Sequence, residues 1–370
     1  MTGGPAGKCR CMRWAALAAL IALLPAVGCG SKTSDSGVPI KLVDEPRTIG
    51  LGMIGAPVVV DGDVLVHVAY RHDRMLVVRR DLSSGAPRTL LRQPAEPWSV
   101  EEIAARDGRA AVEMSAPRRL AVVHRVLEAS PSGGRPRVLR RASDRADCGG
   151  KVSVHNVTPA REILVSEVRV SCGSGPRGTL VLRLYGPAGS RTVLRRQMTP
   201  DRAGRLITEP VLRAGVGGGR IFLADPGEIE VLEPTGRRRV MRPPSSEVFA
   251  GAEINDRGDL LIHKASGERF TTSLIRRGHA EPVELVEAPL DRAASVRLCG
   301  DLVVRYARRG GGEAELSVAR VKDTTRYRRL RAWPARLADA ELICDQRRAV
   351  LIRRRGASGP SSAEVVLLPR

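Results

Sequence analysis

The sequence predicts an all-β protein built from repeated units. Short runs of aliphatic and β-branched residues recur from residue 38 onward, and long helical periodicity is hard to find. Turns rich in Gly, Asp and Pro separate these runs. A turn followed by three apolar residues and a polar one occurs seven times in all, at a mean spacing of about 48 residues. These three observations favour a fold of repeated antiparallel strands.

The copies of this turn-and-strand unit lie at residues 61–67, 107–114, 159–165, 217–223, 256–263, 299–305 and 345–353. Most copies are followed by a second apolar run, a loop, and a third run that ends in basic residues, as in Met75–Val78 and then Arg88–Arg92. One strand before the turn and three after it give four strands per unit. Residues 100–105 (VEEIAA) are an exception, because they read better as a helical turn than as a strand.

This repeat pattern resembles that of β-propellers of the WD40 or TolB-like kind, although the Trp-Asp signature of WD40 blades is missing. The resemblance implies seven four-stranded blades. The last unit ends one strand short, and the strand-like segment Pro39–Asp44 precedes the first unit. We therefore expect this N-terminal strand to complete the final blade and remove the open edge of the ring. The alternative is a β-sandwich or two smaller β-domains.

The first 28 residues have the pattern of an export signal. Lys8, Arg10 and Arg13 form a positive region, and Trp14–Leu24 forms an apolar core that is too short for an ordinary membrane-spanning helix. Pro25 then ends any helix. The order of charge, apolar core and helix break predicts a removable signal peptide over residues 1–28.

Ala26–Cys29, which follows that core, resembles the lipobox of bacterial lipoproteins, with Ala where Leu is usual. The resemblance implies cleavage before Cys29, which would then be lipidated and anchor the chain to a membrane of the cell envelope. In that family, Asp after the lipidated cysteine favours retention in the inner membrane. This chain has Gly30 there, which favours sorting to the outer membrane. The polar residues 29–37 read as a flexible tether, and residues 38–370 as the propeller domain.

The chain is strongly basic but poor in aromatic residues. It has 370 residues and a formal net charge of +21, and 55 of its 61 cationic residues are arginine. Loss of the three cations of the signal leaves +18. The arginines are spread along the chain and only 3% of residues are aromatic, whereas nucleic-acid binders cluster their cations and often stack bases on aromatic rings. This favours a solvated basic surface and no nucleic-acid partner.

Four cysteines remain after Cys29 and the two in the signal are set aside, and an even number in an exported protein suggests disulfides. Cys299 and Cys344 both come just before the repeated turn in neighbouring copies, where their Cα atoms could lie within bonding range. Cys148 and Cys172 bracket the inner strands of the third copy. We expect Cys299 to pair with Cys344 and Cys148 with Cys172. No CxxC pair or neighbouring His cluster supports a metal site.

No strong catalytic or cofactor signature is present: there is no GxSxG elbow, HExxH, P-loop or Rossmann glycine pattern in a helical context. We therefore name no catalytic, cofactor-binding or metal-binding residue. His67 and His263 occupy the same place in two copies, where other copies have Glu113, Arg305 and Arg353. Such a recurrent polar position would either line an inter-blade groove or the axial channel, or make inter-blade hydrogen bonds.

Two functions remain open at this stage. The first is a non-enzymatic, membrane-anchored lipoprotein whose propeller is a binding or scaffolding platform for an envelope protein or an anionic envelope polymer. The second is a propeller enzyme, a hydrolase or a cofactor-dependent dehydrogenase, with its site at the channel mouth. Such an enzyme would need acids, histidines or metal ligands that converge from several blades.

Overall fold

The structure is a computed structural model. The chain divides into two compact units, residues 1–40 and residues 41–370, and every described residue belongs to the second unit. The expected signal, Cys29 and the tether therefore lie outside the described residues. The structure describes residues 47–52, 54–119, 121–130, 133–145, 148–171, 177–198, 213–289, 294–308, 313–333, 340–353 and 361–369.

All regular elements in the described part of the chain are β-strands, in agreement with the predicted all-β fold. Among these residues, no helix is long and apolar enough to span a membrane. Four sheets of four strands follow the chain in order: β2 (Ile54–Asp61), β3 (Val64–Arg71), β4 (Arg74–Asp81) and β5 (Pro87–Pro94); β14 (Arg213–Gly217), β15 (Arg220–Asp225), β16 (Glu228–Leu232) and β17 (Arg238–Met241); β18 (Val248–Ile254), β19 (Leu260–Ser266), β20 (Arg269–Ile275) and β21 (Val283–Pro289); and β22 (Ser295–Cys299), β23 (Leu302–Arg308), β24 (Ala314–Arg320) and β25 (Asp323–Trp333).

Two sheets depart from this pattern. One has eight strands: β6 (Ser99–Arg106), β7 (Arg109–Arg118), β8 (Ala121–Ala129), β9 (Arg137–Arg145), β10 (Cys148–Val157), β11 (Ile163–Ser171), β12 (Arg177–Gly186) and β13 (Gly189–Met198). The other joins the two ends of the described chain, in the order β1 (Arg47–Gly52), β28 (Ser361–Leu367), β27 (Arg348–Arg353) and β26 (Glu341–Cys344).

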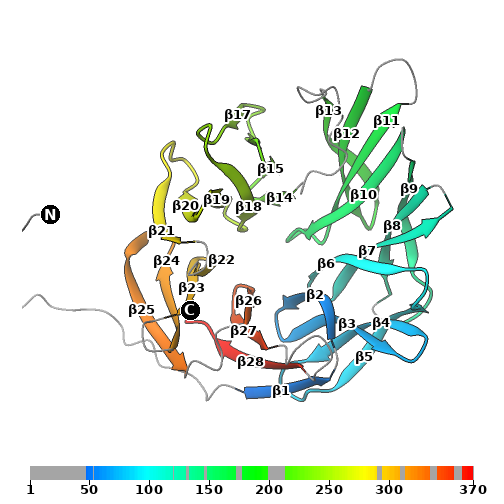
Figure 1. Ribbon diagram of the computed structural model, residues 1–370, viewed down its shortest axis with the longest axis horizontal. Helices are drawn as coiled ribbons and strands as arrows, with labels where there is room; N and C mark the ends of the chain where they lie inside the picture. Colours follow the sequence, from blue (N-terminus) through cyan, green and yellow to red (C-terminus); the bar gives the residue numbers. More distant parts are fainter. Residues whose placement is uncertain are drawn as a thin grey trace, which may run out of the picture. The chain divides into compact units, whose positions relative to one another are not determined.

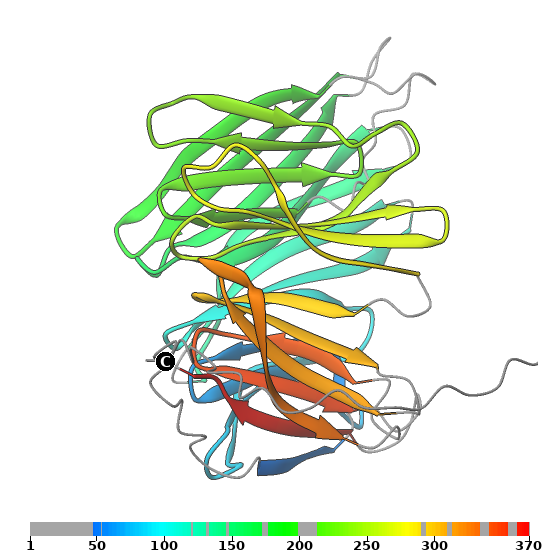
Figure 2. The same ribbon diagram turned by 90° about the vertical axis from the view of Figure 1, so that its left-hand side faces the viewer.

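The first strands of the successive repeats lie around a common axis (Figure 1). Contacts run from β2 to β6, β10, β14, β18, β22 and β26 in turn, and β26 contacts β2 again. In the side view, the orange and red strands of the last two sheets lie below the yellow strands of β18–β21 (Figure 2). The turns after the first strands lie together at one end of the axis, where residues such as Gly62, Asn255 and Gly300 line one cavity.

The expectation of seven separate four-stranded blades is not met. Five sheets are separate and four-stranded, whereas β6–β13 are joined in one sheet. The junction lies between β9 and β10, where Cys148 pairs with Arg145 and Gly149 with Asp144. Only residues 146 and 147 separate these strands, so the end of one is held beside the start of the next. The sequence spacing does not reveal such a junction.

A strand from the N-terminal part of the chain does complete the last sheet, but not with the expected residues. β1 pairs antiparallel with β28, with Arg47 opposite Val365 and Thr48 opposite Glu364. The segment 39–44, which was expected in this role, lies outside the described residues. Closing the last sheet with residues from the other end of the chain covers an edge that would otherwise stay unpaired.

Residues 100–105, for which the sequence suggested a helical turn, belong instead to strand β6. The register with β7 shifts between Val100 and Glu102, which marks a β-bulge. The extra residue resets the alternation of side chains, so Val100, Ile103 and Ala104 are all buried. That i, i+3, i+4 spacing is also the pattern of a helix face, which explains the wrong expectation.

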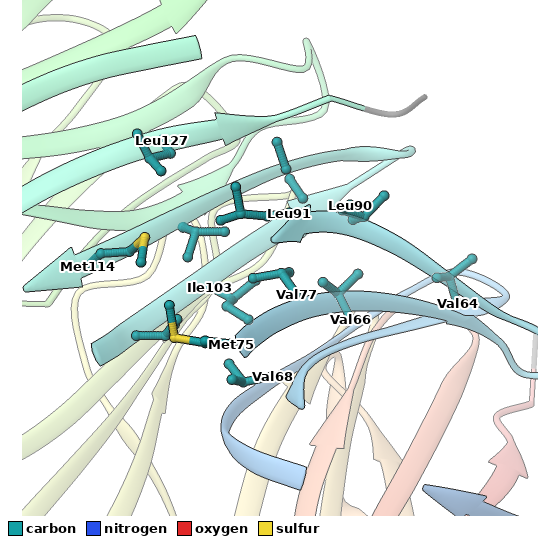
Figure 3. Packing of buried hydrophobic residues seen from close by; sticks show 14 residues of the cluster. Val64, Val66, Val68, Met75, Val77, Leu90, Leu91, Ile103, Met114 and Leu127 are labelled. Carbon is teal, nitrogen blue, oxygen red and sulfur yellow. The ribbon is translucent and has the colours of Figure 1, made fainter. Parts of the chain in front are cut away.

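The sheets pack through layers of aliphatic side chains, in keeping with the 3% aromatic content of the chain. Between sheet β2–β5 and the start of the eight-stranded sheet, Val68, Met75 and Val77 pack with Ile103 and Met114 (Figure 3). Each of these side chains is at most 4% exposed. Full burial of an aliphatic side chain contributes about 1.5–3 kcal/mol relative to exposure. The same arrangement recurs between neighbouring sheets around the axis.

Polar groups of the repeated turns link each sheet to the next. The carboxylate of Asp61 accepts hydrogen bonds from the amides of Asp107 at 2.6 Å and Gly108 at 2.9 Å. The carboxylate of Asp345 likewise accepts from the amide of Gly62. Asp61 ends the first strand of its sheet and Asp345 follows the first strand of its own, and each side chain reaches the turn of the next sheet around the axis. The Asp-rich turns are thus explained by inter-sheet hydrogen bonds.

Arginines at the start of second strands make a second kind of inter-sheet link. Arg220 opens β15, is 3% exposed, and donates to the carbonyl of Gly258 in the next sheet's turn at 2.6 Å. Its Nε also donates to the carboxylate of Glu233 at 2.9 Å. Arg109, at the same place in β7, donates to the carbonyl of Arg161, and this bond links two repeats within the eight-stranded sheet. Part of the arginine excess is therefore buried and structural.

The turn that precedes Arg220 approaches the neighbouring sheet very closely. A Cβ atom at Gly217 would overlap the carbonyl oxygen of Asn255. Gly217 is therefore required by the closeness of two backbones and not by its own dihedral angles.

Candidate anion-binding groove and axial channel

The structure places the two predicted histidines at equivalent points of their strands, but in different surroundings. His67 lies on β3 and is 1% exposed, and His263 lies on β19 and is 9% exposed. His67 lines a groove on the face of β3, β4 and β5. His263 lines the axial cavity. The residue opposite it on β18 is Gly251, which has no side chain to separate the His263 ring from the cavity. The two histidines therefore belong to separate sites.

Another copy uses this recurrent polar position to bond two repeats within the eight-stranded sheet. Glu113 of β7 is 4% exposed and accepts hydrogen bonds from the Val154 amide at 3.1 Å and the Ser153 hydroxyl at 3.2 Å. Burial raises the pKa of Glu113 to about 7, although Lys151 and these hydrogen bonds act in the opposite direction. At this copy, the recurrent position holds two strands of different repeats together.

The groove on β3–β5, called the β3–β5 groove below, has a volume of about 720 Å³. This volume lies within the range of about 300–1,000 Å³ that is typical of small-molecule sites. Its floor is apolar and its walls are cationic. Its described lining is His67, Ala69, Tyr70, Arg71, His72, Arg74, Leu76, Val78, Arg80, Pro87, Thr89 and Arg92.

The strand register explains how the cations come to surround the groove. His67 is opposite Val78, and Ala69 is opposite Leu76, so alternate residues of β3 and β4 form the floor. Leu76 is in turn opposite Arg92 on β5. Arg71 is opposite Arg74 at the end of the β3–β4 hairpin. These positions belong to a single face of three adjacent strands.

The charges of the β3–β5 groove are not balanced within its described lining, which contains four arginines and no carboxylate. Within the described residues, the ion pair that these arginines make joins Arg74 Nε to Asp73 at 3.6 Å, and the Asp73 side chain is 81% exposed. Burial, followed by repulsion from Arg71, lowers the pKa of Arg80. The groove thus holds cations that repel one another.

His67, which lines this groove, has a ring nitrogen without a hydrogen-bond partner among the described residues. Its Nδ1 lies 3.1 Å from the carbonyl oxygen of Val68, and a carbonyl only accepts, so Nδ1 carries the hydrogen. Burial lowers the pKa of His67, with Arg80 acting in the same direction, so the ring is neutral near pH 7. Within the described part of the chain, its Nε2 is buried and has no hydrogen-bond partner. That atom is therefore an unused acceptor.

The axial cavity has two parts, and the larger one, of about 650 Å³, is lined from all the first strands. Glu253 of β18 pairs there with Arg297 of β22 and accepts from the Leu298 amide at 3.0 Å. The Nε2 of His263 lies 3.8 Å from Glu253 Oε1. Burial alone would raise the pKa of Glu253, but Arg297, His263 and the Leu298 amide hold it below its usual range. This carboxylate is committed to a link between two sheets.

A second channel histidine was not identified from the sequence. His155 of β10 lines both parts of the cavity, and its Nε2 lies 2.8 Å from the Ser166 hydroxyl. Burial, with Arg213 and Lys151 nearby, lowers its pKa to about 3. Arg213 donates to Glu102 across the axis at 3.0 Å. The position of His155 just before a repeated turn is the signal that could have revealed it.

The smaller part of the cavity, about 380 Å³, lies at the end where the repeated turns meet. Arg106 donates to Asp256 at 2.6 Å across the mouth, and the Gln346 side-chain amide donates to the same carboxylate. Among the described residues, no group of three or more His, Cys, Asp or Glu side chains is placed to hold a metal ion. The charged side chains at both ends of the cavity thus bond mainly to one another.

Cys299 of β22 and Cys344 of β26 form a disulfide with Cα atoms 5.7 Å apart, which is the pairing expected from their equivalent places in neighbouring repeats. Cys299 is 1% exposed. For the second expected pair, Cys172 lies outside the described residues, as does the side chain of Cys148. The bond between Cys148 and Cys172 therefore stays a prediction.

Arginines gather on the outermost strands of the sheets. The exposed arginines of these strands are Arg88 and Arg92 on β5, Arg191 and Arg195 on β13, Arg238 on β17, and Arg326, Arg328 and Arg329 on β25. Arg137 and Arg141 are exposed on β9, which ends its repeat but lies inside the eight-stranded sheet. β21 differs, since it has Glu284 and Glu287 and no arginine. Charged side chains on edge strands hinder pairing with other chains. They also make the outer faces basic.

No known protein-family model matches this sequence, and no curated protein is significantly similar to it. Solved structures do resemble the fold. The β-propeller domain of the Trilobed protease from Pyrococcus furiosus has a TM-score of 0.54 and 11% identity, with 85% of this chain and 93% of that chain covered. The polysaccharide lyase Uly1 has a TM-score of 0.52 and 10% identity, with 84% and 89% covered. These likenesses define the class of fold, and the chain is a β-propeller protein.

Proposed function

We propose that the protein is a lipid-anchored lipoprotein of the bacterial cell envelope, whose propeller is a non-enzymatic binding platform for an anionic envelope polymer. The leader pattern and Cys29 support the anchor, with the outer membrane favoured by Gly30. We also propose that the eight-stranded sheet acts as two blades, because β6 and β10 both take places in the ring of first strands. On that count the propeller has seven blades.

The observation that carries the proposed binding role is the concentration of exposed arginines on the outermost strands. A basic outer surface attracts polyanions and speeds their encounter with the protein. The axial cavity supports the same conclusion, because Glu253, Arg297 and Asp256 are engaged in links between sheets. A general acid or base needs to be available to a substrate, and these groups are held by one another.

The second candidate function, an enzyme with its site in the channel, is favoured by one specific observation. His155 lines both parts of the cavity near Arg213, and its lowered pKa keeps the ring neutral and able to accept a hydrogen bond from a substrate. Its hydrogen bond with the Ser166 hydroxyl holds the ring in place. We rank this candidate second because the other charged channel groups form inter-sheet pairs.

Retention of the full-length protein on immobilised polygalacturonate, with neutral dextran as the reference matrix, tests the platform. The variant Arg326→Gln/Arg328→Gln removes two exposed cations from β25 and should elute at lower salt than the wild type, because screening competes with fewer charges. The matched variant Glu284→Gln/Glu287→Gln removes two acids from β21 and should elute at higher salt. Equal elution of all three proteins, or equal retention on dextran, would refute an electrostatic polymer platform.

A further inference from the structure

We propose that the β3–β5 groove is a binding subsite for one acidic sugar unit, with arginines that hold the carboxylate and His67 that accepts a hydrogen bond from a sugar hydroxyl. This inference rests on the proposed binding of an anionic polymer and names the chemical unit that the protein would recognise. It assigns the groove a role in specificity, whereas the arginines of the outer strands supply only general attraction.

The need for an anion follows from the charges that line the groove. Arg71, Arg74, Arg80 and Arg92 approach one cavity, and its described lining offers no carboxylate to neutralise them. Guanidinium groups bind carboxylates through paired, charge-assisted hydrogen bonds, which are roughly twice as strong as neutral ones. An oxyanion in the groove would therefore relieve the mutual repulsion of these cations.

The need for a hydroxyl follows from the tautomer of His67. Its Nδ1 donates to the Val68 carbonyl, so Nε2 of the neutral ring has a lone pair and no hydrogen. The His67 ring lines the groove, and its Nε2 has almost no exposed surface and lacks a partner among the described residues. A buried polar atom without a partner destabilises the folded protein. A donor such as a sugar hydroxyl satisfies it, whereas a fully ionised carboxylate has no hydrogen to give.

The floor of the groove fits the remaining part of such a ligand. Ala69, Leu76, Val78 and Pro87 form an apolar surface between the cations. A pyranose ring has faces of C–H groups that can lie on such a surface, while its hydroxyls and its carboxylate point to the rim. Simple anions such as acetate or inorganic phosphate would leave this floor and His67 unused.

Calorimetric titration of the full-length protein tests the proposal, with glucuronate as the probe and glucose, acetate and inorganic phosphate as reference ligands. We expect saturable binding of glucuronate at one site and at least roughly tenfold weaker binding of the three references, since each lacks one part of the recognised group. Arg71→Gln and Arg92→Gln should each weaken glucuronate binding roughly tenfold. Arg88→Gln, an exposed arginine on β5 outside the groove, should leave it unchanged within about twofold.

A spectroscopic readout locates the ligand without a change to a buried residue. In protein with ¹⁵N-labelled histidine, glucuronate should shift the Nε2 resonance of His67 and leave that of His263 in place. The proposal is wrong if glucuronate does not bind, if acetate or phosphate binds equally well, or if Arg88→Gln weakens binding as much as Arg92→Gln.

Failure of this inference can be told apart from failure of the platform. If polygalacturonate retention depends on Arg326 and Arg328 while glucuronate does not bind, the groove proposal fails and the platform stands. If glucuronate binds the groove while the polymer is not retained, the platform fails and the subsite stands.

Discussion

Removal of the disulfide between Cys299 and Cys344 should lower the stability of the propeller by a predictable amount. The bond joins the first strands of two neighbouring sheets across a sequence separation of 45 residues. In the chain-entropy model, a loop of this length contributes about 4 kcal/mol. For a unit of residues 41–370, an unfolding entropy of about 2.1 cal/mol/K per residue converts this to a Tm decrease of about 6 °C.

The assay is thermal unfolding of the variant Cys299→Ala/Cys344→Ala and of the wild type, each with and without reductant. Reductant should lower the Tm of the wild type at least to that of the variant. Any further decrease that reductant causes in the variant would report the second expected bond, between Cys148 and Cys172. A Tm decrease of less than about 1 °C in the variant would refute the reasoning that this bond restricts the unfolded chain.

Three further predictions concern the links between repeats and are checked by denaturant unfolding. Arg220→Gln should cost about 3 kcal/mol, because it removes a buried ion pair and an inter-sheet hydrogen bond, whereas exposed Arg237→Gln should change stability by less than about 0.5 kcal/mol. Gly217→Ala should cost about 2 kcal/mol or more through backbone overlap, whereas Gly227→Ala, whose nearest neighbouring atom would lie at 3.6 Å, should be tolerated. The pKa of Glu113 is raised from an ordinary 4.5 to about 7, so the folded protein holds this proton more tightly than the unfolded chain does. The stability that this raised pKa contributes is therefore complete below pH 4.5 and is lost as the pH rises to 7. In that window, the free energy of unfolding of the wild type relative to Glu113→Gln should fall by up to about 1.4 kcal/mol per pH unit. A difference that stays constant between pH 5 and pH 7 would contradict this prediction.

The repeat architecture could be predicted because it depends on residues that are close together in the sequence. A turn followed by an apolar run is a short-range signal, and its recurrence placed Cys299 and Cys344 at equivalent points of adjacent repeats. The scarcity of aromatic residues likewise indicated aliphatic packing, which Val77 and Ile103 show. In each case, the relevant residues lie close together in the sequence or occupy the same place in the repeat.

The remaining features depend on contacts between distant parts of the chain. The junction of β9 with β10 and the bulge at Val100 are set by register, which the apolar pattern alone does not specify. The ion pair of Glu253 with Arg297 joins residues of two repeats, and either residue alone looks like an ordinary surface charge. The β3–β5 groove depends on the register that places Arg92 beside Leu76, so its arginines could not be told from the others in the sequence.

The most direct test of the central claim, that this propeller binds an anionic envelope polymer, is photo-crosslinking in living cells from a probe placed at Arg92 of the groove. A second probe at Glu284 on β21, an outer strand with acids and no arginine, is the control. We expect mass spectrometry to identify an adduct with an acidic polysaccharide from the groove probe and much less of this adduct from the control probe. Capture of a single protein from both positions, or of no partner from either, would contradict it.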